Sequence, residues 1–549
     1  MNLSNSNRQI WDVAVIGGGI TGAGVLRDCA RRGLRAVLIE RHDIATGATG
    51  RNHGLLHSGA RYAVTDKESA EECIKENMIL KKIASHCVEK TDGFFLTLPE
   101  DDLDFQSKFI EACLSAGIQA EAFDPKEALD IEPFANPNII GAVRVPDGSI
   151  DPFRLTASNI IDAKAQGAQM LTYHEVLGLI REQNRVVGVK VFDHKTKETK
   201  EIYASIVVNA GGIWGQHIAE YAELKIKMFP SKGALLIYGH RVNKLVLNRC
   251  RKPADADILV PGDTICVIGT TSTHIPYEDI DNMQVTPKEV NVLVKGGIEL
   301  APVLKNTRIL RAYAGVRPLV ASDDDPTGRK ISRGIILLDH SIRDGLDGFI
   351  TITGGKLMTY RLMAEWATDL ICKKLNISAV CTTAEEKLPG SHQTMEEINQ
   401  KMISMPSSIR KSAIYRMGDM AEKLPDSNHN ILNNSLVCEC EEVSAGEVEY
   451  AINHLDVHNL VDLRRRTRVG MGTCQGELCA CRAAGLMKHY NRTSSQQSIN
   501  DLASFLNERW KGVRPIAWGD TLRESEFTSW VYEGICGLDL SQKTLKDEV

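Results

Sequence analysis

The sequence has no long uninterrupted hydrophobic run. Among its 549 residues, no apolar stretch approaches the roughly 18 residues that a helix needs to span a bilayer. The first eight residues, Met1 to Arg8, contain no apolar core of the kind found in signal peptides. We therefore expect a cytoplasmic chain that does not itself cross a membrane.

The chain also lacks an excess of positive charge. It carries 65 Lys and Arg against 71 Asp and Glu, which gives a net charge of −6. A general basic field that would hold nucleic acid is therefore absent, and we expect no nucleic-acid partner. Charged residues make up 25% and hydrophobic residues 43%, as in a soluble globular protein. The length exceeds one ordinary core, so two to four domains are expected.

Evidence for a disulfide framework is weak, although the chain has 14 cysteines. Nine of them are scattered singly, as buried or idle thiols of a reducing compartment are. These nine are Cys29, Cys73, Cys87, Cys113, Cys250, Cys266, Cys372, Cys381 and Cys536. The other five lie together between Cys438 and Cys481 and indicate a separate kind of site.

The strongest motif lies between Trp11 and Glu40. An apolar β run, Asp12–Ile16, is followed by Gly17-Gly18-Gly19-Ile20-Thr21-Gly22, a G-x-G-x-x-G pattern that directly follows a strand and opens a helix. In this pattern Gly17 permits a tight turn, Gly19 lets the backbone approach a pyrophosphate, and Gly22 lets the helix lie close to the sheet. This context predicts a dinucleotide-binding βαβ unit.

The acidic end of the second predicted strand narrows the choice of cofactor. The helix is predicted from Ile20 to Arg32, and the second strand runs from Leu34 to Glu40. The helix N-terminus offers N–H groups and partial positive charge to phosphates. A carboxylate at Glu40 accepts hydrogen bonds from ribose hydroxyls, which favours FAD or NAD over a 2′-phosphorylated cofactor.

Two later stretches repeat the strand and glycine-turn pattern. Residues 41–62 first form a long glycine-rich polar loop, which is typically functional. The stretch Val207-Val208-Asn209-Ala210-Gly211-Gly212 then ends a buried strand in small residues. Parallel βαβ elements separated by an insertion would place this stretch beside the first glycine turn. Residues 225–345 are richer in strands, with one helix predicted from Pro287 to Leu300, and residues 348–359 return to strand, glycine turn and helix.

The five clustered cysteines suggest a metal centre. Cys438-x-Cys440 is followed, after 33 residues, by Cys474-x4-Cys479, with Cys481 as a spare thiol. Four thiolates hold zinc or an iron–sulfur cluster, and the one-residue and four-residue spacings fit a [2Fe–2S] cluster better than structural zinc. Between the pairs, Ser444 to His454 is predicted as a helix. Arg464-Arg465-Arg466 is either a docking patch or, by default, a solvated charge run.

Together these blocks resemble a known family. The glycine motif, Thr46-Gly47-Ala48-Thr49-Gly50, Leu56 to Tyr62, Gly315-Val316-Arg317-Pro318-Leu319 and Thr353 to Arg361 are similar to the FAD-dependent glycerol-3-phosphate dehydrogenases. The late cysteines resemble the bacterioferritin-associated-ferredoxin type of [2Fe–2S] domain. The combination resembles the FAD-carrying subunit of the bacterial anaerobic members. The resemblance covers residues from about 10 to 490.

The resemblance implies the roles of individual residues. The substrate-binding cations would be Arg61, Arg317, Arg333 and Lys356, which suit a phosphate dianion. His57 would take or orient the hydroxyl proton, with Arg317 able to stabilise alkoxide character. The metal ligands would be Cys438, Cys440, Cys474 and Cys479. The FAD contacts would be Gly17, Gly19, Ile20, Thr21, Gly22, Glu40, Arg41, Thr46, Thr49, Gly50, Ala210, Gly211, Gly354, Gly355, Lys356, Leu357, Met358 and Thr359.

The resemblance also implies an α/β architecture with three kinds of domain. Residues 1–383 would be the FAD-dependent oxidoreductase, with a Rossmann-like FAD-binding domain formed from about 10–80, 145–225 and 345–383. A β-rich substrate domain would be inserted, mainly at 80–145 and 225–345. A linker at 384–432, a small helical [2Fe–2S] domain at 433–495 and a tail at 496–549 would complete the chain.

The implied activity is the oxidation of sn-glycerol 3-phosphate to dihydroxyacetone phosphate in glycerol metabolism and anaerobic respiration. Electrons would leave FAD through the cluster toward a second, flavoprotein-like subunit, then an iron–sulfur subunit that anchors the complex in the membrane, and finally the membrane quinone. The chain would then attach peripherally to the inner face of the cell membrane through a partner. Two alternatives stay open: an amino-acid or 2-hydroxyacid dehydrogenase of the same fold, and a redox-sensing or iron-handling protein that only holds a cluster.

Overall fold

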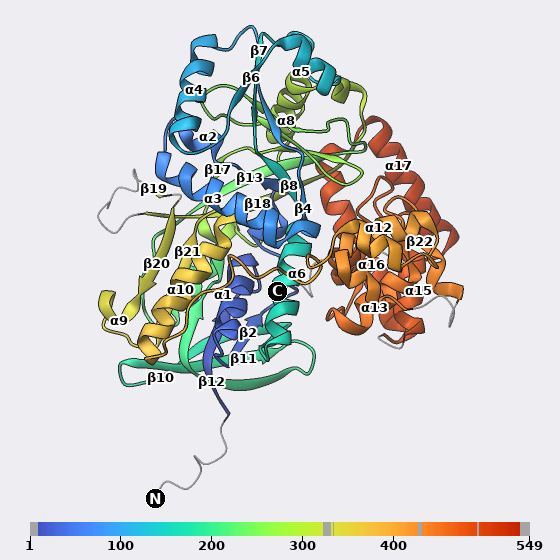
Figure 1. Ribbon diagram of the computed structural model, residues 1–549. Helices are drawn as coiled ribbons and strands as arrows, with labels where there is room; N and C mark the ends of the chain where they lie inside the picture. The colour runs from blue at the N-terminus through green and yellow to red at the C-terminus, as the bar shows by residue number, and fades with distance from the viewer. Residues whose placement is uncertain (1–8, 322–330, 333, 426–430, 491–492, 539–549) are drawn as a thin grey trace, which may run out of the picture.

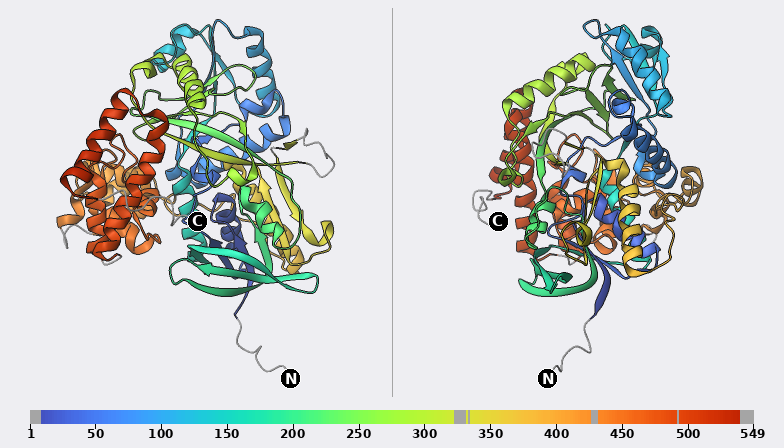
Figure 2. Two further views of the ribbon diagram at one scale, coloured as in Figure 1. Left: turned by 180° about the vertical axis from the view of Figure 1, so that it is seen from behind. Right: turned by 90° about the vertical axis from the view of Figure 1, so that its left-hand side faces the viewer.

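The computed structural model describes residues 9–321, 331–332, 334–425, 431–490 and 493–538. Two large sheets form the first two thirds of the chain, and a helical C-terminal part lies alongside them (Figure 1). Views from behind and from the side show the same arrangement (Figure 2). No helix in the described residues combines the length and the apolar character needed to cross a membrane.

The first sheet is built around β1, Ile10–Ile16. β1 pairs in parallel with β2 (Ala36–Glu40) and with β12 (Glu198–Asn209). Val13 to Val15 form a continuous apolar run and are fully buried, as is usual in central parallel strands. The sheet is completed by β9 (Gln169–Thr172) beside β2, β21 (Phe349–Gly354) beside β12, β20 (Ile335–Asp339), and the hairpin β10 (His174–Glu182) and β11 (Arg185–Asp193).

Three helices cover one face of this sheet. They are α1 (Ile20–Arg31), α6 (Pro152–Ala165) and α10 (Tyr360–Leu375), and their apolar residues share a core with β1 and β2. The predicted first helix is confirmed to within one residue. The second strand begins at Ala36 rather than at Leu34, because the N–H and the guanidinium of Arg35 are bonded to the Asp12 carboxylate near the start of β1.

The second sheet is mixed and draws its strands from two separate stretches of the chain, 93–145 and 228–332. Its longest strands pair with each other near one edge of the sheet: β13 (Met228–Tyr238) against β18 (Ile309–Ala321). α8, predicted and found at Pro287–Leu300, packs on this sheet in its apolar core. The other strands are β5 (Gly93–Thr97), β6 (Glu121–Phe123), β7 (Gly141–Val145), β14 (Val246–Arg249), β15 (Ile258–Pro261), β16 (Cys266–Gly269), β17 (Thr273–His274) and β19 (Ile331–Ser332).

A small third sheet and short helices connect the two large sheets. The small sheet consists of β3 (Leu55–Leu56), β4 (Val88–Glu89) and β8 (Gly148–Ile150). α2 (Ala60–Ala63) and α3 (Lys67–Ile83) follow β3 in the chain. α4 (Leu103–Ser115) and α5 (Pro125–Ile131) pack against the strands of 93–145. The loop after β2 therefore leads directly from the first sheet toward the second.

The C-terminal part is mostly helical, and its first segment differs from the predicted linker. Residues 384–432 contain α11 (Met395–Lys401) and α12 (Ser407–Met417), whose apolar residues pack into a small core that Tyr450 joins. The remaining elements are β22 (Leu436–Cys438), β23 (Val443–Ser444), α13 (Ala445–His454), α14 (Leu460–Thr467), α15 (Cys479–His489), α16 (Ser495–Val513) and α17 (Gly519–Ser529).

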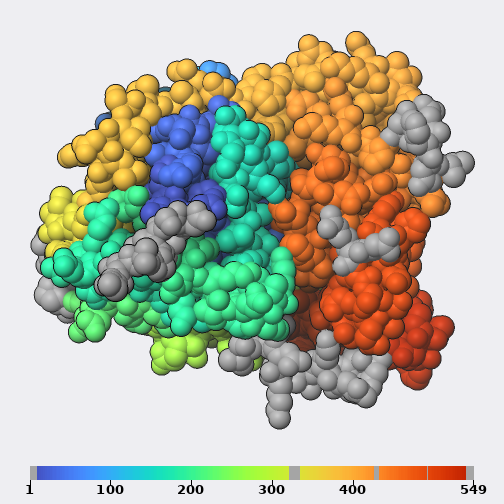
Figure 3. Space-filling view, turned by 90° about the horizontal axis from the view of Figure 1, so that it is seen from below, coloured from blue at the N-terminus to red at the C-terminus, as the bar shows by residue number. Residues whose placement is uncertain are grey.

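The three consecutive arginines of α14 are not the solvated charge run expected by default. Arg466 is 2% exposed and forms an ion pair with Asp43, which Arg465 also contacts. Arg464 lies over the ring of Phe505 in α16. Figure 3 shows the C-terminal part, in orange, directly against the teal segment that includes α6. The arginines are buried because their partners come from other elements.

Candidate cofactor and substrate sites

The first glycine turn leaves no room for side chains. Gly17 has a φ of +110°, and a Cβ there would lie 2.6 Å from the carbonyl oxygen of Ala210. A Cβ on Gly22 would lie 1.9 Å from the carbonyl oxygen of Gly17. The Ala210 N–H donates to the carbonyl oxygen of Ile16 at 2.9 Å, so the 207–212 stretch lies beside the first turn, as predicted.

Glu40 closes this turn from the second strand. Its carboxylate accepts hydrogen bonds from the N–H groups of Gly18 at 2.7 Å and His42 at 2.8 Å. Burial raises the pKa of Glu40 although both bonds act against that rise. Thr49 of the following loop accepts a hydrogen bond from the N–H of Ile20 at 3.1 Å. The predicted contacts Thr46, Thr49 and Gly50 therefore belong to a loop that is held against the start of α1.

A third glycine turn follows β21. Gly354 and Gly355 have φ values of +77° and +65°. A Cβ on Gly355 would lie 2.5 Å from the sulfur of Met363. The Lys356 N–H donates to the Thr359 hydroxyl at 2.9 Å, which fixes the turn that contains Leu357 and Met358.

These turns form a setting that fits FAD. They follow the carboxyl ends of β1, β12 and β21, which are neighbours in one parallel sheet and therefore meet at one edge. Glycines at which an added Cβ would clash, such as Gly17, Gly354 and Gly355, let the backbone approach a pyrophosphate closely. Another predicted contact, Arg41, pairs with Asp281 at 2.7 Å and lies over the Trp214 ring. FAD contacts at individual residues remain predictions.

The loop after β2 brings His57 beside the end of the cofactor turns. Asn77 donates to the carbonyl oxygens of Leu56 and His57 at 3.1 Å each, and Asp147 accepts from both the N–H and the hydroxyl of Ser58. The backbone that carries His57 is therefore fixed on both sides. The ring itself is half-buried.

Three predicted cations act on this ring or on the neighbouring ring of His53. Lys356 lies 4.8 Å from the ring centre of Tyr62, which in turn lies 5.6 Å from the ring centre of His57. Arg61 donates through Nη2 to Ala254 and Asp257, while its buried Nη1 has no hydrogen-bond partner among the described residues. Arg317 donates to the Ser231 hydroxyl, the Thr271 carbonyl oxygen and the Thr270 hydroxyl.

Electrostatic interactions link these groups to one another. Burial, and then the charges of His53, Arg61 and Lys356, lower the pKa of His57 well below its usual value. Burial, and then Arg317 and Arg61, lower the pKa of His53 to about 3. Both rings are neutral at physiological pH. The fourth predicted cation, Arg333, lies outside the described residues.

Sequence reasoning missed His53 and Tyr62 as members of this site. His53 lies 6.1 Å from His57 between ring centres, and its Nδ1 accepts from the N–H of Leu55 at 3.3 Å. Both residues lie in the glycine-rich loop of residues 41–62, and Tyr62 also ends the block that resembles the family. Their place in this loop was the signal that could have marked them as site residues. Two residues that hold the Arg317 guanidinium are distant from it in the sequence: Ser231 lies opposite it on β13, and Thr270 lies in the loop after β16.

The four predicted cluster ligands also come together. Contact with Cys479 lowers the pKa of the Cys438 thiol to about 7, and contact with Cys440 lowers that of Cys474. No group of three or more His, Cys, Asp or Glu in the described residues is placed to hold a single metal ion. A [2Fe–2S] cluster needs fewer protein ligands around each metal ion, because its four cysteines are divided between two irons. Cys481 is exposed, as expected of the spare thiol.

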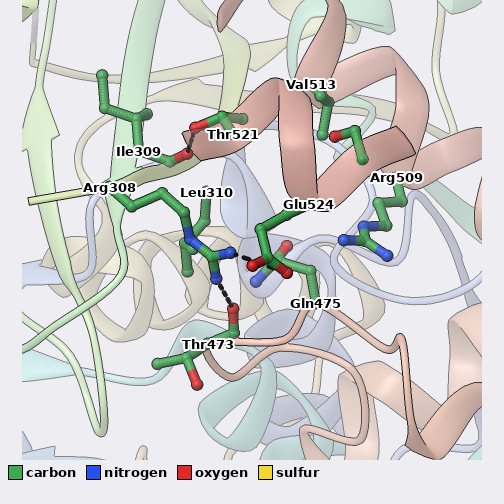
Figure 4. A pocket seen from close by; sticks show the side chains of 10 residues that line it. Arg308, Ile309, Leu310, Thr473, Gln475, Arg509, Val513, Thr521 and Glu524 are labelled. Carbon is green, nitrogen blue, oxygen red and sulfur yellow. Dashed lines mark hydrogen bonds and ion pairs between the residues drawn. The ribbon is translucent and has the colours of Figure 1, made fainter. Parts of the chain in front are cut away.

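A small cavity lies beside the cluster loop, between β18 and α17. Its volume is about 10 Å³, enough for one water molecule, so it is no substrate site. Figure 4 shows Arg308 directed at the carbonyl oxygen of Thr473, 2.7 Å away, and at the Glu524 carboxylate, 3.3 Å away. Thr473 precedes the predicted ligand Cys474, and its hydroxyl contacts the Cys440 sulfur at 3.4 Å. Arg308 therefore supports the ligand loop from outside.

Comparison with known proteins identifies both halves of the chain. Residues 12–361 match the FAD dependent oxidoreductase family, and residues 436–489 match the BFD-like [2Fe-2S] binding domain. A protein of Escherichia coli K12, named as one of the subunits of anaerobic glycerol-3-phosphate dehydrogenase, is 66% identical over 98% of this chain and 99% of its own length. The chain belongs to this family of dehydrogenase subunits.

Other members of the dehydrogenase subunit family support this assignment. The Haemophilus influenzae protein of the same name is 67% identical over 96% of this chain and 93% of its own length. The FAD complex of a glycerol-3-phosphate dehydrogenase from Bacillus halodurans shares the fold, with a TM-score of 0.70, 23% identity, and coverage of 93% of this chain and 97% of that one. As a member of this family, the chain is an FAD-dependent oxidoreductase with a [2Fe–2S] domain.

Proposed function

We propose that this chain oxidises sn-glycerol 3-phosphate to dihydroxyacetone phosphate. The observations that carry the proposal are that Arg61 and Lys356 act on the half-buried ring of His57, next to the third glycine turn, and that Arg317 and Arg61 act on the neighbouring ring of His53. The identity to proteins named for this activity supports the substrate. A phosphate dianion requires fixed cations, whereas an amino acid or hydroxy acid requires fewer.

The three cations can bind the oxyanions of the substrate in different ways. Arg317 is held by three oxygen acceptors, so its guanidinium has a fixed plane, and a planar guanidinium suits oxyanions. Arg61 has one end anchored by Asp257 and the other, Nη1, available to a ligand. Lys356 supplies a point charge directly from the cofactor turn. We assign the phosphate to these groups.

His57 is assigned to the hydroxyl group of the substrate. FAD, when bound, accepts the hydride from C2. The neutral ring of His57 then orients the hydroxyl group or takes its proton, and Arg317 stabilises the negative charge that develops on the oxygen. The fixed backbone at residues 56–58 holds the ring in place for this role.

Because the pKa of His57 is lowered, its charge state gives a testable pH dependence. The ring is neutral well below pH 6.5, so kcat/KM should show no acid limb from His57 near that value. We expect His57→Gln to lower kcat by about 10²- to 10⁴-fold with little change in KM. Steady-state kinetics of the wild-type protein and of His57→Gln, from pH 5.5 to 8.5, check both points. Titration of the substrate's phosphate gives the same pH dependence in both proteins, so a difference between them comes from His57. Wild-type kcat in His57→Gln would contradict the assignment, and an acid limb near pH 6.5 that disappears in this variant would contradict the lowered pKa.

The proposal as a whole is tested by anaerobic titration of the flavin. Glycerol 3-phosphate should bleach the flavin absorbance, whereas amino acids and 2-hydroxyglutarate should not. Bleaching by one of the latter compounds alone would favour the alternative dehydrogenase of the same fold. A protein that only holds a cluster would show no steady turnover with glycerol 3-phosphate and an artificial dye acceptor.

We further propose that electrons leave through partner subunits. Two observations support this: the relatives are named as one subunit of a larger enzyme, and a [2Fe–2S] domain beside a flavin domain is useful when a further acceptor follows. The proposed partners are a second, flavoprotein-like subunit and an iron–sulfur membrane-anchor subunit, which would pass electrons to quinone. The chain itself would lie at the cytoplasmic face of the membrane. We also propose the domain boundaries that the resemblance implies.

A further inference from the structure

One buried carboxylate of the FAD domain, Asp43, holds two arginines of the cluster domain. Asp43 is 1% exposed and accepts from Arg466 at 2.6 and 3.1 Å and from Arg465 at 3.0 Å. Burial tends to raise the pKa of Asp43, but Arg466 and then Arg465 hold it below its usual value. The pair is therefore charged and shielded from water, unlike a surface ion pair.

Asp43 belongs to the same turn as the acidic residue of the cofactor site. Glu40 accepts from Gly18 and His42, His42 accepts from the N–H of Tyr173 at 3.0 Å, and Ala45 donates to the carbonyl oxygen of Gly18 at 3.0 Å. The turn from 40 to 45 is thus tied at both ends to the first glycine turn. A shift of Asp43 cannot occur without a shift of this hydrogen-bonded set.

A second buried contact joins the same two regions. The Tyr173 hydroxyl, between β9 and β10, donates to Asp462 at 2.7 Å and accepts from Asn459 at 2.7 Å. Asp462 and the two arginines lie on one helix, α14. The turn that carries Glu40, and Tyr173, which is hydrogen-bonded to this turn, therefore both bind α14. By contrast, the pair of Lys164 with Asp456 at this boundary is exposed and does not involve the turn.

From this geometry we infer that Asp43 is a positioning residue that couples FAD binding to docking of the cluster domain through Arg465 and Arg466. Occupation of the cofactor site orders the 40–45 turn, which strengthens the hold on α14, and docking of α14 in return favours the turn that FAD requires. Such coupling is reciprocal by thermodynamic necessity. It also keeps the two redox sites at a constant separation.

The wild-type protein provides the first test. In full-length protein stripped of FAD and then reloaded, hydrogen–deuterium exchange is measured by mass spectrometry. FAD should slow exchange across residues 460–467 of α14 as well as in the glycine turns. Protection confined to the FAD domain would overturn the inference, and this measurement requires no variant.

Variants on both sides of the contact provide the second test. Asp43→Asn, and Arg466→Ala in the other domain, should each weaken FAD affinity by about tenfold, a typical coupling strength, and remove the FAD-dependent protection of α14. Lys164→Ala is the matched control, with unchanged affinity and protection. Arg466→Ala separates coupling from local damage to the turn. Wild-type affinity in Arg466→Ala would refute the coupling, whatever substrate the enzyme proves to use.

Discussion

Replacing Arg317 by alanine is expected to raise KM for glycerol 3-phosphate by about tenfold and to lower kcat by about 10²-fold. The guanidinium is fixed by Ser231, Thr270 and Thr271 and acts electrostatically on His53, so it lies inside the site rather than at its rim. Removing it takes away a ground-state contact with the substrate and a donor to the oxygen that becomes negative. The two kinetic constants should therefore change together.

Two further variants make this result specific. Arg317→Lys keeps the charge but loses the planar fork, so it should restore part of KM and less of kcat. Arg144→Ala removes an arginine from the same sheet, where it pairs with Asp92 and not with the site, and should leave both constants unchanged. Flavin content measured on each protein shows that the fold is intact. Wild-type kinetics in Arg317→Ala would remove this residue from the site.

The sequence was sufficient for elements that are defined locally. The glycine spacing after an apolar strand predicts β1, α1 and β2, and the helix predicted over Pro287–Leu300 is found with the same bounds as α8. The return of residues 207–212 to the first turn was also predictable, because parallel strands meet at their carboxyl ends. In each of these cases the structure is determined by residues a few positions apart or by the order of the strands in the sheet.

Features that depend on distant partners could not be predicted in this way. Arg466 looks solvated in its own helix, and only the structure shows Asp43, more than 400 positions earlier, beside it. Residues 395–424 look polar on average, yet Ile398 and Ala413 find a shared core with Tyr450. Ser231 and Thr270, which hold Arg317, lie 86 and 47 positions before it, so no spacing in the sequence marks them.

Replacing Cys474 by serine is expected to abolish the visible absorbance of the cluster, with iron and acid-labile sulfide falling to near zero, while FAD is retained and dye-linked oxidation of glycerol 3-phosphate partly persists. The reason is the separation of the cores: the cluster ligands belong to a helical core around α13 to α16, and the glycine turns belong to the parallel sheet. A serine hydroxyl is a poor substitute for a thiolate ligand. Cys481→Ser is the matched control, since this thiol is exposed and its loss should leave the cluster intact. If Cys474→Ser also loses FAD, the contact through Asp43 transmits more than docking, and the two cofactor sites fold as one unit.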